Sequence, residues 1–158
     1  MQLTRAADYA VRVMIHMASQ PEGTMVRLKT LADAAGAPEK FLAKLLQNLT
    51  RAELVVSRRG PNGGFELASG AKSATMMQVI EAIEGPFALN VCLSEKGCER
   101  QEWCPAHTVW AQAQDAMLSV LRKHTIQDLA GQGEQRKAHA NKPVRLPGSI
   151  DVIAVQNS

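Results

Sequence analysis

The sequence of 158 residues has no long apolar run, no recognisable signal peptide and only three cysteines. No stretch of about 18 apolar residues occurs, so we expect no membrane-spanning helix and no membrane partner. The opening segment MQLTRAADYAV lacks the basic, apolar and small-residue order of a secretory leader. We therefore expect a cytoplasmic protein. Thiols stay reduced in that compartment, where clustered cysteines more often bind metal or perform redox chemistry than form disulfides.

The motifs of common enzymes are also missing. The chain has no phosphate-binding loop, no catalytic triad order and no paired carboxylates at a recognisable site. We therefore expect a protein that is not an enzyme. A redox enzyme or an electron-transfer protein stays open as an alternative, because three cysteines can hold a redox centre.

Positive charge is concentrated in the first half of the chain. Residues 1–72 hold ten Lys and Arg against six Asp and Glu, a net charge of +4, whereas residues 73–133 hold four against seven, a net charge of −3. Residues 134–158 hold four against two. A basic first half followed by an acidic middle predicts an anionic partner for the first half and a different role for the middle.

Apolar residues recur at helical spacing in the first 51 residues. Thr4 is a good N-cap for an amphipathic helix over residues 5–19. A short helix over residues 28–35 follows, and Pro38 stands where a third helix begins. We expect the apolar face of this third helix to consist of Phe41, Leu42, Leu45, Leu46 and Leu49.

The spacing between the second and third helices is typical of a helix-turn-helix. Small Ala32 allows a close helix crossing, Gly36 suits a left-handed turn, and Leu42 packs the third helix onto the second. Short strands around residues 55–57 and 65–67 flank RRGPNGG, in which Asn62-Gly63 is a strong hairpin signal. The sequence therefore predicts a winged helix-turn-helix that binds double-stranded DNA. The candidate DNA-binding residues are Glu39, Lys40, Ala43 and Lys44 on the third helix and Arg58 and Arg59 on the wing.

The second half of the sequence predicts further helices around an irregular segment. A helix over residues 76–83 ends at Gly85-Pro86, and Pro105 begins a long helix. A continuous apolar face on that long helix predicts packing against a second copy, and therefore a homodimer. That face consists of Val109, Trp110, Ala113, Ala116, Met117, Val120 and Leu121. A capping box at Thr125 starts a last short helix through Leu129, and we expect a polar, mobile tail from residue 131, interrupted by an uninterpreted apolar patch, IDVIAV.

The irregular segment holds all three cysteines, Cys92, Cys98 and Cys104, each six residues from the next, with His107 close behind. Three thiols cannot pair completely with one another. Structural zinc sites usually carry paired ligands two to four residues apart, so the wider spacing favours an iron–sulfur cluster. A zinc site and a thiol-based redox switch stay open as alternatives.

The opening MQLTRAADYAVR, the RGPNGGF wing and the three-cysteine loop resemble the Rrf2 family of bacterial regulators, which includes iron–sulfur sensors of the IscR, NsrR and RirA types. The resemblance covers about residues 1–130. It implies a winged helix-turn-helix region at residues 1–72, a cluster-binding loop and dimerisation helix at residues 73–130, and a tail at residues 131–158. The fold class would be mainly α with a small β-hairpin wing and a long dimerisation helix. The implied function is an iron–sulfur cluster-dependent transcriptional repressor that senses nitric oxide, iron or redox state, with the three cysteines as ligands.

The resemblance leaves the fourth ligand of the cluster open. In IscR-like members a histidine three residues after the third cysteine completes a 2Fe–2S site, and His107 holds that position. In NsrR-like members an aspartate near the N-terminus of the other subunit completes a 4Fe–4S site, and Asp8 holds that position. We favour His107 because it needs no second chain. Asp8 has another simple explanation, as a carboxylate that complements the helix dipole.

Overall fold

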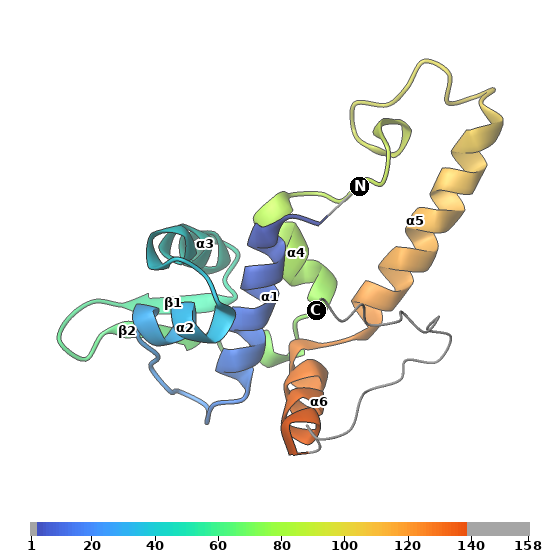
Figure 1. Ribbon diagram of the computed structural model, residues 1–158. Coiled ribbons are helices and arrows are strands. Elements are labelled where there is room, and N and C mark those ends of the chain that lie inside the picture. The colour runs from blue at the N-terminus through green and yellow to red at the C-terminus, as the bar shows by residue number, and fades with distance from the viewer. Residues whose placement is uncertain (1–2, 139–158) are drawn as a thin grey trace, which may run out of the picture.

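The computed structural model describes residues 3–138 and shows a mainly helical chain with one β-hairpin (Figure 1). The predicted fold class, a winged helix-turn-helix followed by a long helix, is confirmed. Within the described residues, no helix is long and apolar enough to cross a membrane. The elements are α1 (Arg5–Ala18), α2 (Leu28–Ala35), α3 (Glu39–Arg51), β1 (Val55–Arg58), β2 (Gly64–Leu67), η1 (Ala71–Ser73), α4 (Met76–Glu84), η2 (Val91–Leu93), α5 (Pro105–Lys123) and α6 (Ile126–Ala138).

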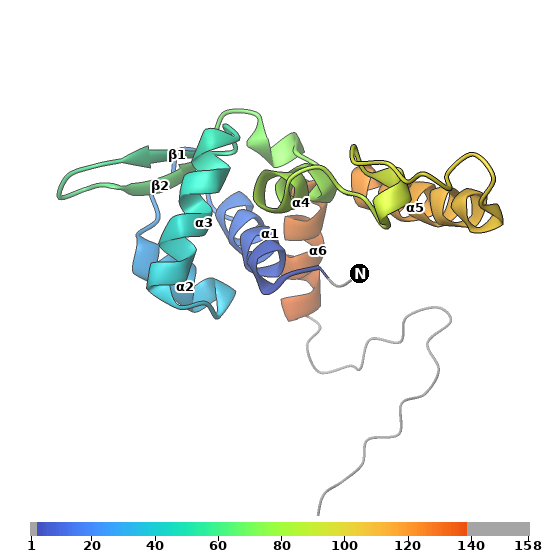
Figure 2. The same ribbon diagram turned by 90° about the horizontal axis from the view of Figure 1, so that it is seen from above.

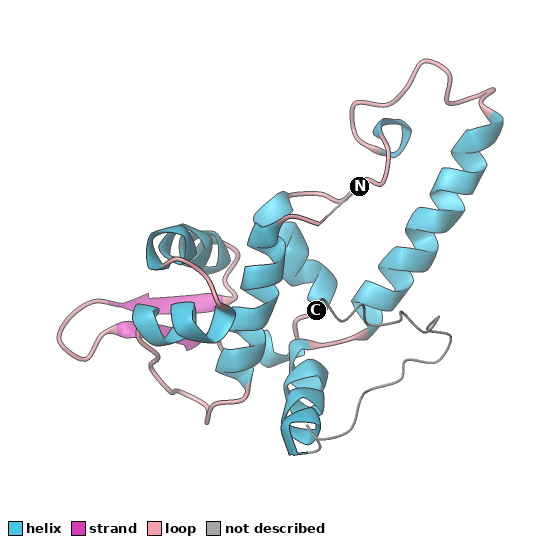
Figure 3. Ribbon diagram, in the orientation of Figure 1, coloured by secondary structure: helices cyan, strands magenta, loops and turns pink. Residues whose placement is uncertain are grey.

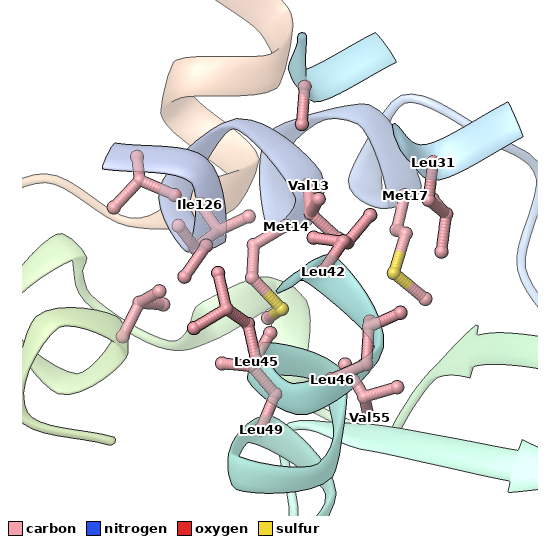
Figure 4. Close-up of a cluster of buried hydrophobic side chains, with 14 of the residues drawn as sticks. Val13, Met14, Met17, Leu31, Leu42, Leu45, Leu46, Leu49, Val55 and Ile126 are labelled. Atoms are coloured by element: carbon pink, nitrogen blue, oxygen red, sulfur yellow. The ribbon is translucent and has the colours of Figure 1, made fainter. Parts of the chain in front are cut away.

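Helix α1 lies at the centre of the structure and packs against α2, α3, α4 and α6 (Figure 1). Its N-cap is Thr4, as predicted, whose side chain accepts a hydrogen bond from the Ala7 amide. Val13 and Met14 of α1 are fully buried against Leu42 and Leu46 of α3 and Ile126 of α6 (Figure 4). The core therefore joins the helix-turn-helix to α4 and α6, across the boundary predicted at residue 72.

The helix-turn-helix is closed by a left-handed residue at the end of α2. Gly36 has a φ of 68°, which glycine adopts without the steric cost that a side chain brings. The Ala37 amide donates to the carbonyl of Ala32 at 3.0 Å, which satisfies one of the last carbonyls of α2. This turn sets the direction in which α3 leaves α2.

Phe41 does not belong to the buried face of α3, contrary to the prediction. Its exposed fraction is 41%, and its ring meets the edge of Tyr9 with the ring centroids 6.1 Å apart. Phe41 precedes Leu42, so it lies about 100° around the helix from the centre of the buried face. The aromatic pair instead covers the side of the contact between α1 and α3.

The predicted hairpin is confirmed, but its turn is built differently. Strands β1 and β2 pair antiparallel with Val55 opposite Leu67, and a five-residue loop joins them. The Gly63 amide donates to the Gly60 carbonyl at 2.9 Å, so Pro61-Asn62 forms the centre of the turn rather than Asn62-Gly63. Pro61 favours this arrangement because its fixed φ suits the first central position of a turn. A Cβ at Gly63 would lie 2.3 Å from the Arg58 carbonyl oxygen, so glycine is needed there for close approach.

Helix α5 extends away from the rest of the structure, as Figures 1 and 2 both show. The loop that precedes it, pink in Figure 3, runs from the end of α4 to the far end of α5. Helix α6 then returns to the core, where Ile126 and Ala130 are buried. Two backbone hydrogen bonds join the starts of α4 and α6: the Met76 amide donates to His124 at 2.9 Å, and the Ile126 amide donates to Ala74 at 2.8 Å.

The last helix is longer than predicted, since it continues past Leu129 to Ala138. Residues 131–138, expected to be the start of a mobile tail, are therefore helical. Gly131 and Gly133 disfavour a helix by about 1 kcal/mol each, but most of the neighbouring Gln, Glu, Arg, Lys and Ala residues favour one. The rest of the expected tail, including the patch IDVIAV, lies outside the described residues.

Candidate functional site

The exposed side of α3 carries the residues predicted to face DNA. Glu39, Lys40 and Lys44 are exposed and Ala43 is partly buried, all within the first two turns of the helix. Leu42 and Leu46 hold the opposite side in the core. No ion pair involves Lys40 or Lys44 within residues 3–138, so both ammonium groups are available to an anionic partner.

The two arginines of the wing differ in their surroundings. The guanidinium of Arg58 forms an ion pair with Glu66 on the neighbouring strand, with 2.6 Å between Nη2 and Oε1. Arg59 begins the loop of the hairpin and has no ion pair in the part of the chain that the structure describes. The sequence analysis missed Glu66. Its position between Phe65 and Leu67 on a strand places it on the face opposite theirs, but the pairing with Arg58 depends on a strand register that the sequence did not specify.

The three cysteines lie along the loop between α4 and α5, and all are free and partly buried. Cys92 lies in η2, Cys98 lies between tight turns, and Cys104 is the N-cap residue of α5. The loop is anchored to α5 where the Leu89 amide donates to Gln114 Oε1 at 2.9 Å. The predicted ligands therefore lie on one loop, but in separate turns of it.

In residues 3–138 of this single chain, no three side chains of His, Cys, Asp or Glu form a group that could hold a metal ion. One ring nitrogen nevertheless lacks a partner beside the loop. Among the residues that the structure describes, the buried His107 Nδ1 has no hydrogen-bond partner, whereas the His107 backbone amide donates to the Cys104 carbonyl at 3.0 Å. A buried polar atom without a partner is costly unless another group satisfies it. Thiolates and imidazole are donors suited to an iron–sulfur cluster, so the residues present fit such a group.

Asp8, the other candidate ligand, lies in the first turn of α1 and has a partner in the same chain. Its carboxylate pairs with Arg12 at 2.7 Å, and about half of each side chain is exposed. Arg12 Nη1 also donates to the Ala35 carbonyl at 3.3 Å, at the end of α2. The Asp8 carboxylate is therefore linked through Arg12 to the turn of the helix-turn-helix.

The start of α1 is also joined to the start of the cysteine-containing loop. The Thr4 hydroxyl donates to the carboxylate of Glu84, the last residue of α4. Gly85, immediately after Glu84, has a φ of 79° and ends the helix, as predicted. The Thr4–Glu84 contact therefore joins the N-cap of α1 to the residue that precedes the loop.

Comparison with known proteins agrees with this geometry. Residues 3–132 match the family model Rrf2, described as an iron-dependent transcriptional regulator. The putative HTH-type transcriptional regulator Rv1287 of Mycobacterium tuberculosis is 36% identical over 135 residues, which cover 83% of this chain and 82% of that protein.

Two solved structures share the fold. CymR, the global cysteine regulator of B. subtilis, is 28% identical with a TM-score of 0.68, and the match covers 84% of this chain and 98% of that one. IscR of T. potens is 23% identical with a TM-score of 0.66, and the match covers 92% of this chain and 93% of that one. The family model spans the wing, the cysteine-containing loop and most of α6 in one continuous match. The chain belongs to the Rrf2 family of transcriptional regulators.

Proposed function

We propose that this protein is an iron–sulfur cluster-dependent repressor that binds an operator as a homodimer and senses nitric oxide, iron or redox state. The main observation in favour of the cluster is that His107 Nδ1 has no hydrogen-bond partner among residues 3–138. His107 lies one helical turn after Cys104, and the loop before Cys104 holds two further free thiols. The family supports the regulatory part of the proposal.

DNA binding is assigned to the exposed side of α3 and to the wing. Lys40 and Lys44 are exposed without ion pairs, and the N-terminal part of a recognition helix is the part that reaches base edges in the major groove. Arg59, the first residue of the loop between β1 and β2, is placed to contact a phosphate or the minor groove. Glu39 and Ala43 complete the proposed surface.

The cluster is assigned to Cys92, Cys98, Cys104 and a fourth ligand, with His107 favoured over Asp8. A bound cluster supplies a centre that reacts with oxidants, nitric oxide or a change in iron supply. The chain contributes the three thiol side chains, and Cys104 is the N-cap residue of α5, one helical turn before His107. His107 would bind through Nδ1, which has no hydrogen-bond partner among residues 3–138.

We assign the interface with the second copy of the chain to the exposed face of α5. Val109 and Val120 are 63% and 57% exposed, and Trp110 is 41% exposed, although all three are apolar. A helix that extends from the core with such a face is well placed to pack against its symmetry mate. A dimer also supplies two recognition helices for half-sites about 34 Å apart.

Purification without oxygen tests the cluster. We expect a coloured protein with visible absorbance, bound iron and acid-labile sulfide, which selects one duplex from a random pool. His107→Ala should weaken cluster retention, whereas His124→Ala, at the other end of α5, should not. A colourless protein that contains zinc or no metal would contradict the proposal.

A thiol-based regulator is the second candidate. Its support is that the three cysteines are free and partly accessible, and that CymR, a cysteine regulator in its own organism, shares the fold at 28% identity. A thiol switch predicts that iron-free protein loses or gains DNA affinity on mild oxidation and recovers it with a reductant. An iron–sulfur sensor predicts that this cycle leaves the iron-free protein unchanged.

A further inference from the structure

An acidic side chain lies almost buried in the wing, on a surface assigned to DNA. Glu66 is the only buried polar or charged residue within the described chain, and its side chain is 12% exposed. A carboxylate on a surface that approaches phosphates is repelled by them, so its presence needs an explanation. The inference below rests on the proposed DNA-binding function.

Glu66 lies on β2, which pairs with β1 on one side and forms an isolated bridge with Val26 on the other. Glu66 lies opposite Val56 of β1, and the preceding residue, Phe65, exchanges two backbone hydrogen bonds with Val26, with amide-to-carbonyl distances of 2.8 and 2.9 Å. Alternation along the strands places Glu66, Val56 and Arg58 on the face opposite the core. Both edges of β2 are therefore hydrogen-bonded at or next to Glu66, which fixes the backbone that carries the carboxylate.

The partner of this carboxylate remains largely open to solvent. The Arg58 side chain is 65% exposed, and only Nη2 is engaged, at 2.6 Å from Glu66 Oε1. A guanidinium has five N–H donors in a rigid plane, so most of them remain free to bind a second acceptor. The ion pair fixes one edge of the guanidinium and leaves the rest facing outward.

Stability alone does not explain the pair. Because the Arg58 side chain is largely exposed, its ion pair with Glu66 adds little to the free energy of unfolding, and Val56 offers an apolar neighbour at this site. A fixed guanidinium, in contrast, loses less side-chain freedom on binding and contacts an acceptor in only one direction.

We propose that Glu66 is a positioning residue for operator recognition, which holds Arg58 so that its free donors meet one defined place on the DNA. In this arrangement Arg59 makes a DNA contact that does not depend on the base sequence. Arg58 makes a contact that forms only when the wing lies at one defined position on the operator. The two adjacent arginines therefore have different roles.

Paired affinity measurements on the full chain test this role. An operator is first selected from random duplexes by the parent protein, and binding to it and to an unrelated duplex is then followed over a range of salt concentrations. For Glu66→Gln we expect operator affinity to fall about tenfold, the scale of one lost specific contact. Affinity for the unrelated duplex should not fall, because a negative charge has been removed.

Two further variants separate positioning from folding. Arg58→Ala should lose a similar factor, and the double variant Glu66→Gln, Arg58→Ala should lose no more than Arg58→Ala alone, because the two residues act through one contact. Glu66→Met keeps the volume and favours folding, yet should show the same loss of selectivity.

The proposal is overturned if Glu66→Met or Glu66→Gln keeps the parent's ratio of operator to unrelated affinity, or if the losses in the double variant multiply. A parent protein that selects no duplex would instead overturn the proposed function itself.

Discussion

At the scale of single residues, the structure separates side chains that are already paired from those that are free. Arg59 has no ion pair within residues 3–138, whereas its neighbour Arg58 is paired with Glu66. We predict that Arg59→Ala weakens binding to every duplex by a similar factor and reduces the slope of affinity against salt by about one phosphate contact. Fluorescence anisotropy at four salt concentrations measures both effects. Lys123→Ala, at the C-terminal end of α5, is the control, and an unchanged salt slope in Arg59→Ala would remove Arg59 from the DNA contact.

Lys40 should act differently, because it lies at the start of α3 rather than on the wing. We predict that Lys40→Ala changes the preferred operator sequence more than it changes affinity for unrelated DNA, since the start of a recognition helix reads base edges. Selection from a random pool with each variant measures this directly. An identical selected sequence from the variant and the parent would show that Lys40 does not read a base.

The two candidates for the fourth cluster ligand are also distinguished at this scale. His107 Nδ1 has no partner, whereas the Asp8 carboxylate is satisfied by Arg12 at 2.7 Å. We predict that His107→Ala loses the visible spectrum after anaerobic reconstitution and that Asp8→Ala retains it. Loss of the spectrum in Asp8→Ala alone would assign the ligand to Asp8 and imply that the two subunits share the site.

At the scale of elements, helix ends could be predicted well because they depend on neighbouring residues. The capping box at Thr125 is present: the Asp128 amide donates to Thr125 Oγ1 at 3.1 Å, and the Asp128 carboxylate accepts from both the Thr125 hydroxyl and amide. The hairpin was also predictable, although Pro61 shifted its turn by one residue. The extension of α6 to Ala138 could not be predicted, because two glycines and a lack of apolar residues remove the sequence pattern by which a helix is recognised.

The cap of α6 gives a prediction for pH. Hydrogen bonds from the Thr125 side chain, and then from its amide, lower the pKa of Asp128 below its ordinary value of 3.8. A lowered folded-state pKa means that the charged carboxylate stabilises the fold above pH 3.8 and that this contribution is lost as pH falls through the lower, folded value. We predict that Thr125→Ala reduces the free energy of unfolding by about 1 kcal/mol at pH 7.

Asp128→Asn should also have a lower free energy of unfolding than the parent, and this deficit should shrink towards pH 3. Urea unfolding at both pH values measures this, and a deficit independent of pH would show that the charge of Asp128 is not involved.

At the scale of the whole molecule, the arrangement of α5 is the main feature. Its apolar face could be predicted from periodicity, and the structure places Val109 and Val120 on the exposed side. The placement of the three thiols in separate turns of the loop could not be predicted, because a loop of tight turns has no repeating pattern. The proposed second copy and the proposed cluster would be external to the chain, so neither sequence periodicity nor local turn chemistry specifies their geometry.

A charge placed on the exposed apolar face of α5 tests the proposed dimer interface. We predict that Val120→Glu shifts the protein towards the monomer by at least tenfold in dissociation constant, since a buried charge is unfavourable in an apolar interface. Ser119→Glu adds the same charge on an exposed but neighbouring side of α5 and should leave the dimer intact. Sedimentation equilibrium compares the two, and equal association of both variants would place the interface elsewhere.

Coupling between the cluster and DNA is the central claim. The contacts that can carry it are present in the chain: Thr4 with Glu84 at the start of the loop, and Asp8 with Arg12 and Ala35 at the turn before α3. A cluster that orders the loop can shift α3 only through a difference in interaction energy between two states of the dimer.

The most direct measurement is operator affinity with and without the cluster, in one buffer and without oxygen. Cys98→Ala removes one thiolate from a loop outside the core, so we expect a folded, colourless protein. The account predicts that its operator affinity differs from that of the cluster-containing parent by about 5- to 150-fold, the range of typical allosteric coupling. Equal affinity of the two proteins for every operator selected by either would contradict a sensor and leave the cluster a structural role.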